Sequence, residues 1–121
     1  MINGLRSAIY PVADLAAAKA WYIQVFGVAP YFDEPFYVGF AVGGFELGLL
    51  PDGVPGTTGV QVYWGVDDIV AEAERITALG ASTHTAIEDV GGDIRMVQLA
   101  DPFGNVLGLI QNPHFDPAAM R

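Results

Sequence analysis

The sequence contains an internal repeat, and this repeat limits the possible folds more than any other feature. The segment 7–15, SAIYPVADL, returns as 61–69, QVYWGVDDI, at an offset of 54 that keeps a Val and an Asp in register. The segment 45–50, FELGLL, returns as 105–110, NVLGLI, at an offset of 60. A duplication of this size predicts two similar modules that bury their apolar faces together.

Composition excludes several classes of protein. The chain has 121 residues, 52% of them hydrophobic and 16% charged, which predicts one globular domain over 1–121. A formal charge of −9 argues against nucleic acid as a partner. No apolar run reaches the roughly 18 residues of a membrane span, and no leader segment is apparent, so we expect a cytoplasmic protein without a membrane partner. The absence of cysteine excludes thiolate nucleophiles and zinc-thiolate sites.

Both modules begin with a short apolar segment followed by an amphipathic helix. In the first, Asp14 is a helix N-cap and Gly27 a stop; in the second, Asp67 or Asp68 caps a helix that Gly80 ends. Glycine-rich turns then separate further strands. The predicted strands are 6–12, 29–33, 36–43 and 45–50, then 60–66, 82–88, 93–100 and 105–111.

This order predicts an α+β fold of two βαβββ modules. Module 1 covers about 5–50, a linker 51–59, module 2 about 60–111, and a C-terminal tail 112–121 that we expect on the surface or as a strap across a neighbour. The alternative is an open ferredoxin-like sandwich, whose repeat is βαβ. The three strands predicted after each helix favour the βαβββ interpretation.

Several motifs, in order and at matching spacings, resemble the vicinal oxygen chelate superfamily, which contains glyoxalase I, bleomycin and fosfomycin resistance proteins and extradiol dioxygenases. The match covers about 5–111. Its motifs are Val12-Ala13-Asp14-Leu15, Ala18 with Trp21-Tyr22, Phe26-Gly27, Val66-Asp67-Asp68 and Asp101-Pro102-Phe103-Gly104-Asn105. The resemblance implies paired curved antiparallel sheets around a central cleft. It also implies a homodimer, because members of the superfamily often build each cleft from both chains.

In the metal enzymes of that superfamily, the ligands stand on the first and last strand of each module. Carried over by spacing, these positions are Ser7, Gly48, Gln61 and Gly108. Two glycines and two neutral, weak donors do not hold a divalent transition metal, which wants about three His or carboxylate ligands. We therefore expect no metal and no cofactor, and we expect the glycines to leave room for a ligand on the floor of the cleft.

Strand alternation then selects the residues that line the cleft. Glu46 shares a face with Gly48 and is a weak candidate for a catalytic base or an anchor for a cation, the alternative being a solvated strand end. Five aromatic residues, Tyr31, Phe32, Phe36, Tyr37 and Phe40, could stack on a planar ligand or fill the core. The complete expected ligand-binding set is Ser7, Ile9, Phe36, Tyr37, Glu46, Gly48, Gln61, Tyr63 and Gly108.

Two histidines, His84 and His114, fall outside the ligand positions and are interpreted as surface residues. The interpretation we favour is a metal-independent protein of the bleomycin resistance type that sequesters a planar compound, cationic in view of the net charge. The alternative is a glyoxalase-like or dioxygenase-like enzyme with a non-standard site. A third interpretation is an accessory domain whose cup is filled by its own side chains.

Overall fold

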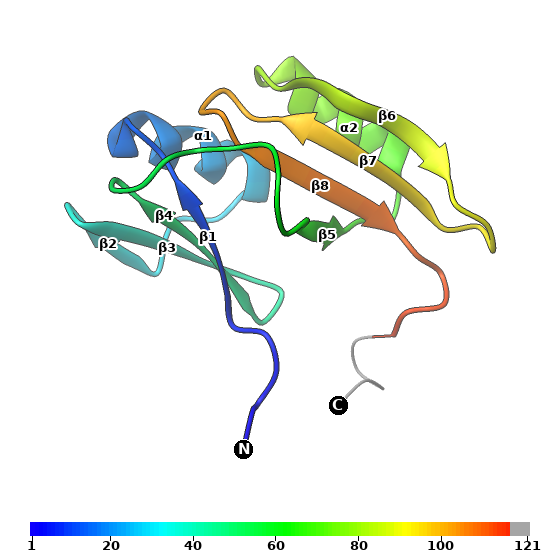
Figure 1. Ribbon diagram of the computed structural model, residues 1–121, viewed down its shortest axis with the longest axis horizontal. Coiled ribbons are helices and arrows are strands. Elements are labelled where there is room, and N and C mark those ends of the chain that lie inside the picture. Colours follow the sequence, from blue (N-terminus) through cyan, green and yellow to red (C-terminus); the bar gives the residue numbers. More distant parts are fainter. Residues whose placement is uncertain (117–121) are drawn as a thin grey trace. The chain divides into compact units, whose positions relative to one another are not determined.

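The computed structural model of the protein describes residues 1–116 and contains the βαβββ arrangement twice (Figure 1). The first series is β1 (Ser7–Pro11), α1 (Leu15–Phe26), β2 (Phe32–Glu34), β3 (Tyr37–Val42) and β4 (Phe45–Leu50). The second is β5 (Tyr63–Gly65), α2 (Ile69–Ala78), β6 (Ser82–Asp89), β7 (Arg95–Ala100) and β8 (Val106–Gln111). The ferredoxin-like alternative, with its βαβ repeat, is excluded.

The described residues group into two compact units. The first contains residues 1–56 with 103–105, and the second contains the remainder of the described chain. Each unit has one four-stranded sheet, in the order β1-β4-β3-β2 and β5-β8-β7-β6 respectively. The fold is the expected α+β arrangement, and its strand pairs are antiparallel except that β1 runs parallel to β4 and β5 runs parallel to β8. The reason is the helix after each first strand, which acts as the crossover that a parallel pair requires.

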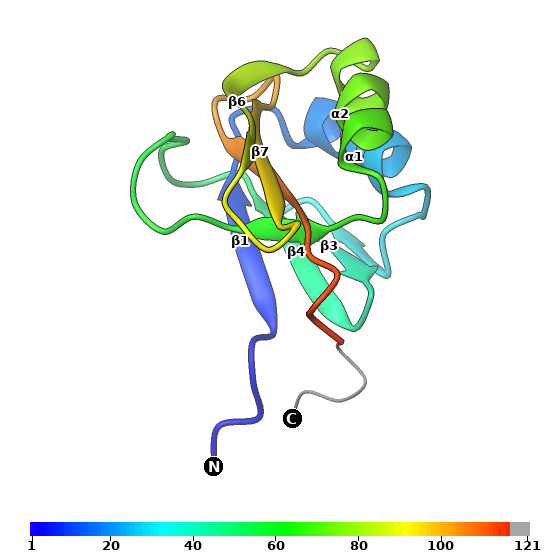
Figure 2. The same ribbon diagram turned by 90° about the vertical axis from the view of Figure 1, so that its right-hand side faces the viewer.

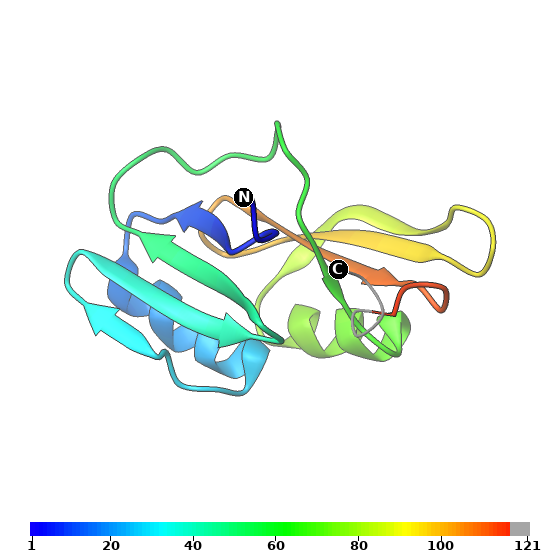
Figure 3. The same cartoon turned by 90° about the horizontal axis from the view of Figure 1, so that it is seen from below.

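Helix α1 covers one face of the first sheet, as the perpendicular views show (Figures 2 and 3). Asp14 caps it by accepting a hydrogen bond from the Ala17 N–H, and Gly27 ends it in the left-handed conformation at φ 71°. The buried side chains of α1 and of the sheet that it covers form the core of this unit: Tyr10, Val12, Ala18, Trp21, Tyr22, Val25, Val38, Phe40, Leu47 and Leu49.

The second sheet is covered by α2 in the same way. Asp68, not Asp67, caps this helix by accepting from the Ala71 N–H. The core between α2 and its sheet contains Ile69, Ala73, Ile76, Ala81, Val97, Leu99, Leu107 and Leu109. Arg95 lies on this helix-side face with Val97, because alternate residues of β7 share a face.

The β7–β8 turn contributes residues 103–105 to the first unit. The Phe103 ring meets Trp21 edge-on, with centroids 6.0 Å apart. Asn105, 6% exposed, donates from Nδ2 to the Pro11 carbonyl at 2.7 Å and accepts from the Gly56 N–H at 3.3 Å. One amide side chain thus holds two separate backbone segments of the first unit.

Asn105→Ala is expected to lower the free energy of unfolding by about 1–3 kcal/mol, because it leaves the Pro11 carbonyl and the Gly56 N–H without their partner in two part-buried hydrogen bonds. Urea unfolding followed by circular dichroism measures this loss. Asn3→Ala, at an exposed position, is the matched control and should change little. Equal behaviour of the two variants would contradict the role assigned to Asn105.

Most predicted strand bounds agree with the structure to within two or three residues. The largest differences are in the predicted strands 29–33 and 60–66, since β2 and β5 each begin three residues later, at Phe32 and Tyr63. The carbonyl oxygen of Val62, the residue before β5, lies on the side of Gly108 where a Cβ would be. Residues 117–121 of the predicted tail lie outside the described residues. Neither helix of the described chain is long and apolar enough to cross a membrane.

Candidate functional site

Cross-strand pairing gathers the first set of predicted site residues on the sheet face opposite α1. Ser7 is the register partner of Glu46, and Ile9 the partner of Gly48. Gly48 in turn pairs with Gly39 of β3. Directly opposed residues share a face, so the face carries Ser7, Ile9, Phe32, Glu34, Tyr37, Gly39, Ala41, Glu46 and Gly48. We call this the open face of the first sheet.

The carboxylate of Glu46 is the polar centre of this open face. Its Oε1 accepts hydrogen bonds from the Ser7 hydroxyl at 2.7 Å and from the Tyr37 hydroxyl at 2.6 Å. Its Oε2 accepts a third from the hydroxyl of Tyr31. Glu46 is therefore not merely a solvated strand end, because three hydroxyl groups from different parts of the chain converge on it.

Two glycines make this convergence possible. A Cβ on Gly39 would lie 2.7 Å from Glu46 Oε2 and 3.1 Å from the Tyr31 ring. A Cβ on Gly48 would meet the Tyr37 hydroxyl at less than 3.0 Å, a separation that real Cβ atoms essentially never show. The expectation that Gly48 leaves its space to a ligand is thus wrong for the volume directly above it, since the Tyr37 phenol fills it.

The hydrogen bonds shift the pKa values of the groups that form them. Desolvation raises the pKa of Glu46, but the three hydroxyl donors together outweigh it and hold the pKa below its ordinary value. The pKa of Tyr37 is raised, first by burial and then by its bond to the Glu46 carboxylate, and that of Tyr31 is raised mainly by its bond to Glu46. At neutral pH the cluster is one carboxylate held by neutral phenols.

These shifts predict how stability depends on pH. Because the folded pKa of Glu46 is lowered, its contribution is present above the ordinary value of 4.5 and is lost as the pH falls through the folded pKa. The difference in melting temperature between the native chain and Glu46→Gln should be steady between about pH 6 and 8 and should shrink in acid below 4.5. A difference that stays constant into acid would contradict the assignment.

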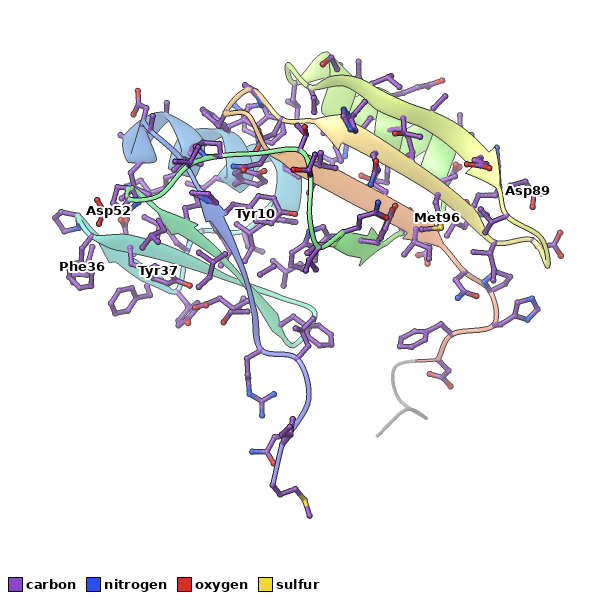
Figure 4. The ribbon with its side chains drawn as sticks, viewed as in Figure 1. Tyr10, Phe36, Tyr37, Asp52, Asp89 and Met96 are labelled. Carbon is purple, nitrogen blue, oxygen red and sulfur yellow. The ribbon has the colours of Figure 1, made fainter. Side chains whose placement is uncertain are left out.

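Exposed aromatic rings lie beside the two tyrosines that bind Glu46. Tyr31 and Phe36 are each 64% exposed and Phe32 is 39% exposed, whereas Tyr37 is half-buried. The Phe32 ring lies between the other three, with centroids 6.5 Å from Tyr31, 6.0 Å from Phe36 and 6.1 Å from Tyr37. Figure 4 labels Phe36 and Tyr37 at the β2–β3 end of this sheet. We call Tyr31, Phe32, Phe36 and Tyr37 the aromatic patch.

The predicted residues of the second module lie in the second unit and form an uncharged chain of hydrogen bonds. The Thr85 hydroxyl donates to Gln98 Oε1 at 3.1 Å, and Gln98 Nε2 donates to the Tyr63 hydroxyl at 3.1 Å. The Tyr63 hydroxyl donates to Gln61 Oε1 at 3.1 Å. The Tyr63 ring lies 2.8 Å from where a Cβ on Gly108 would be, so a tyrosine fills this glycine's space too.

Comparison with known proteins gives a family and a fold. The model of the Glyoxalase/Bleomycin resistance protein/Dioxygenase superfamily matches residues 4–109. The chain belongs to this superfamily. Comparison with curated proteins gives no match.

Solved structures of the superfamily share the fold at low sequence identity. A glyoxalase-related enzyme from Fulvimarina pelagi is 19% identical, with a TM-score of 0.79 over 98% of this chain and 94% of that one. Lactoylglutathione lyase from Agrobacterium tumefaciens is 20% identical, with a TM-score of 0.77 over 96% and 100%. A fosfomycin resistance protein from Listeria monocytogenes is 20% identical, with a TM-score of 0.79 over 94% and 97%.

Because the superfamily includes metal enzymes, the four carried-over positions can be tested for their fit to an ion. The Ser7 hydroxyl is engaged with Glu46, and the Gln61 amide oxygen accepts from Tyr63. Gly48 and Gly108 offer no side-chain donor, and tyrosines fill the space above both. Within residues 1–116, no group of three or more His, Asp or Glu side chains could hold an ion. These residues do not fit the metal of their superfamily relatives.

Sequence reasoning missed three site residues. The sequence identifies Tyr31 only as one of five aromatic residues, yet its hydroxyl donates to Glu46. Thr85 and Gln98 are not among the residues that the sequence pattern selects. Tyr31 precedes β2, so strand alternation gave no information about its direction, and the backbone hydrogen bond from its N–H to the Gly39 carbonyl is what orients it. His84 and His114 are exposed, as predicted for surface residues.

Proposed function

We propose that this superfamily member is a metal-independent binding protein that sequesters a planar organic cation on the open face of its first sheet. The observation that carries the proposal is the ionised Glu46 carboxylate, held by the Ser7 hydroxyl and by the hydroxyls of two members of the aromatic patch, Tyr31 and Tyr37. A fixed negative charge beside exposed rings attracts a cation both by charge and by the negative faces of the rings.

The net charge of −9 supports the same ligand class. A protein this acidic attracts cations over long range and repels anions such as phosphate esters. On the open face, Glu34 adds a second, exposed carboxylate directly opposite Tyr37 in the β2–β3 pair. Charge and surface chemistry therefore favour the same kind of molecule.

The alternative, an enzyme in which Glu46 acts as a base, is less well supported. A general base works best when its pKa lies near the operating pH, which for a carboxylate means a raised pKa. The three hydroxyl donors lower the pKa of Glu46 instead. Such a carboxylate is a poor proton acceptor and a good electrostatic anchor.

Binding of the planar cation proflavine, followed by fluorescence anisotropy, tests the proposal. We expect saturable binding that Glu46→Gln weakens at least about tenfold, the equivalent of about 1.4 kcal/mol. Glu88→Gln is the matched control, since it removes the same charge from an exposed position on β6 of the second unit. The planar anion 1-pyrenesulfonate should bind much more weakly.

Two outcomes would overturn the proposal. One is an equal loss of proflavine affinity in Glu46→Gln and Glu88→Gln, which would show that only overall charge matters. The other is a divalent ion retained at one per chain after purification, measured by elemental analysis. We further propose a homodimer, supported by the superfamily resemblance and measured by multi-angle light scattering.

A further inference from the structure

The hydrogen-bonding capacity of Glu46 is nearly exhausted by the protein itself. An ionised carboxylate has about four lone-pair sites. Ser7 and Tyr37 occupy both sites of Oε1, and Tyr31 occupies one site of Oε2. The charge of the carboxylate stays in place, while little remains for a ligand that must donate hydrogen bonds to it.

From this arrangement we infer that the open face binds cations without N–H donors, namely quaternary ammonium groups and N-alkylated aromatic rings, more tightly than cations of similar size that donate N–H groups. This inference rests on the proposed function and specifies its ligand class. A quaternary cation approaches Glu46 without displacing any of the three hydroxyl groups, since it interacts with the carboxylate through charge alone.

The aromatic patch supplies the other half of the recognition. Aromatic faces attract a cation within about 6 Å of the ring centroid, and aromatic cages are the usual way to bind quaternary ammonium. The ring centroids of Tyr31, Phe36 and Tyr37 lie 6.0–6.5 Å from the centroid of the Phe32 ring. The methyl groups of a quaternary cation would contact these aromatic rings directly. A primary ammonium would have to lose part of its hydration shell before it could make the same contact.

The discrimination arises because the two kinds of cation pay different desolvation costs. A primary ammonium is compact and strongly hydrated. It has three N–H donors but finds only one unoccupied lone-pair site on Glu46. To form a second bond to the carboxylate it would have to displace a hydroxyl such as that of Tyr31, exchanging one charge-assisted hydrogen bond for another. The quaternary cation loses less hydration and leaves all three bonds intact.

The hydroxyl groups are held in place before any ligand arrives. Tyr37 lies in the space above Gly48, and Tyr31 and Glu46 lie in the space above Gly39. The Tyr31 backbone N–H is also bonded to the Gly39 carbonyl at 3.0 Å. These contacts form within the protein itself, so the carboxylate has its three donors without any ligand.

Isothermal titration calorimetry with benzyltrimethylammonium and benzylammonium tests the inference on the full chain. We expect benzyltrimethylammonium to bind at least about tenfold more tightly than benzylammonium, with the neutral benzyl alcohol weaker than both. Tyr31→Phe and Ser7→Ala each free one lone-pair site of Glu46. Each variant should therefore bring the two dissociation constants closer together, mainly by strengthening the binding of benzylammonium. Phe36→Leu, at an exposed position, should weaken benzyltrimethylammonium selectively.

The outcomes separate this inference from the proposed function. Benzylammonium binding as tightly as its trimethylated counterpart would overturn the inference, while proflavine binding that depends on Glu46 would leave the proposed function standing. Failure of all three cations to bind would overturn both. Glu88→Gln is again the charge-matched control and should leave the ratio unchanged, and a melting curve for each variant confirms that it is folded.

Discussion

Gly108→Ala should destabilise the protein by about 3 kcal/mol, the upper part of the usual range for forcing atoms into a packed site. The added Cβ would meet the Val62 carbonyl oxygen at less than 3.0 Å and the Tyr63 ring at 2.8 Å. The first of these is a backbone atom, so relief requires the chain before β5 to move. A urea titration measures the loss as a lower midpoint.

Two glycine variants provide the comparison. Gly48→Ala should cost less than Gly108→Ala, because its Cβ meets only the Tyr37 side chain, whose hydroxyl end can swing away from Glu46. Gly65→Ala in β5 meets nothing within 4 Å and should be close to neutral. If Gly108→Ala were as mild as Gly65→Ala, the close approach of Val62 to Gly108 would be wrong.

Tyr22→Ala is expected to cost about 4 kcal/mol, in the range for removing a large buried ring. Tyr22 is fully buried, and its ring meets Trp21 edge-on at 4.8 Å and Tyr10 at 6.0 Å. It also stacks on Phe26 at 5.7 Å and lies 6.5 Å from Phe103 of the β7–β8 turn. Since a domain is stable by only about 5–15 kcal/mol, this single change should remove a large share of the stability.

Phe36→Ala is the informative control for Tyr22→Ala, because it also removes an aromatic ring but at a position that is 64% exposed. Its effect on the midpoint of chemical unfolding should be within about 0.5 kcal/mol. Similar losses in the two variants would mean that the aromatic patch is part of the core, which would also remove the basis for ligand stacking there.

The fold could be read from the sequence because its signals are local. Asp14 and Gly27 mark the ends of α1 through capping chemistry that involves only neighbouring residues. Gly43 and Gly44 both adopt positive φ in the predicted β3–β4 hairpin. The parallel pairing of β1 with β4 was missed, since it depends on how the crossover returns the chain and leaves no local signature.

The candidate site could be predicted only in part. Alternation along β4 correctly gave Glu46 and Gly48 the same face. Which aromatic residues are buried could not be predicted: Phe40 is fully buried beside Phe26, whereas Phe36 is exposed. From the sequence alone, Phe36 and Phe40 are both possible stacking partners for a ligand. Only the pairing register of the strands distinguishes the core face of the sheet from the open face.

The tyrosine above each glycine also constrains how such a protein can evolve. An acidic side chain gained at Gly48 would collide with Tyr37, whereas a small residue in place of Tyr37 would deprive Glu46 of a donor. Because the two positions share one space, the effect of a mutation at Gly48 should depend on the residue at position 37, the pattern that geneticists describe as epistasis. A carboxylate ligand at position 48 therefore requires coupled changes at Gly48 and Tyr37.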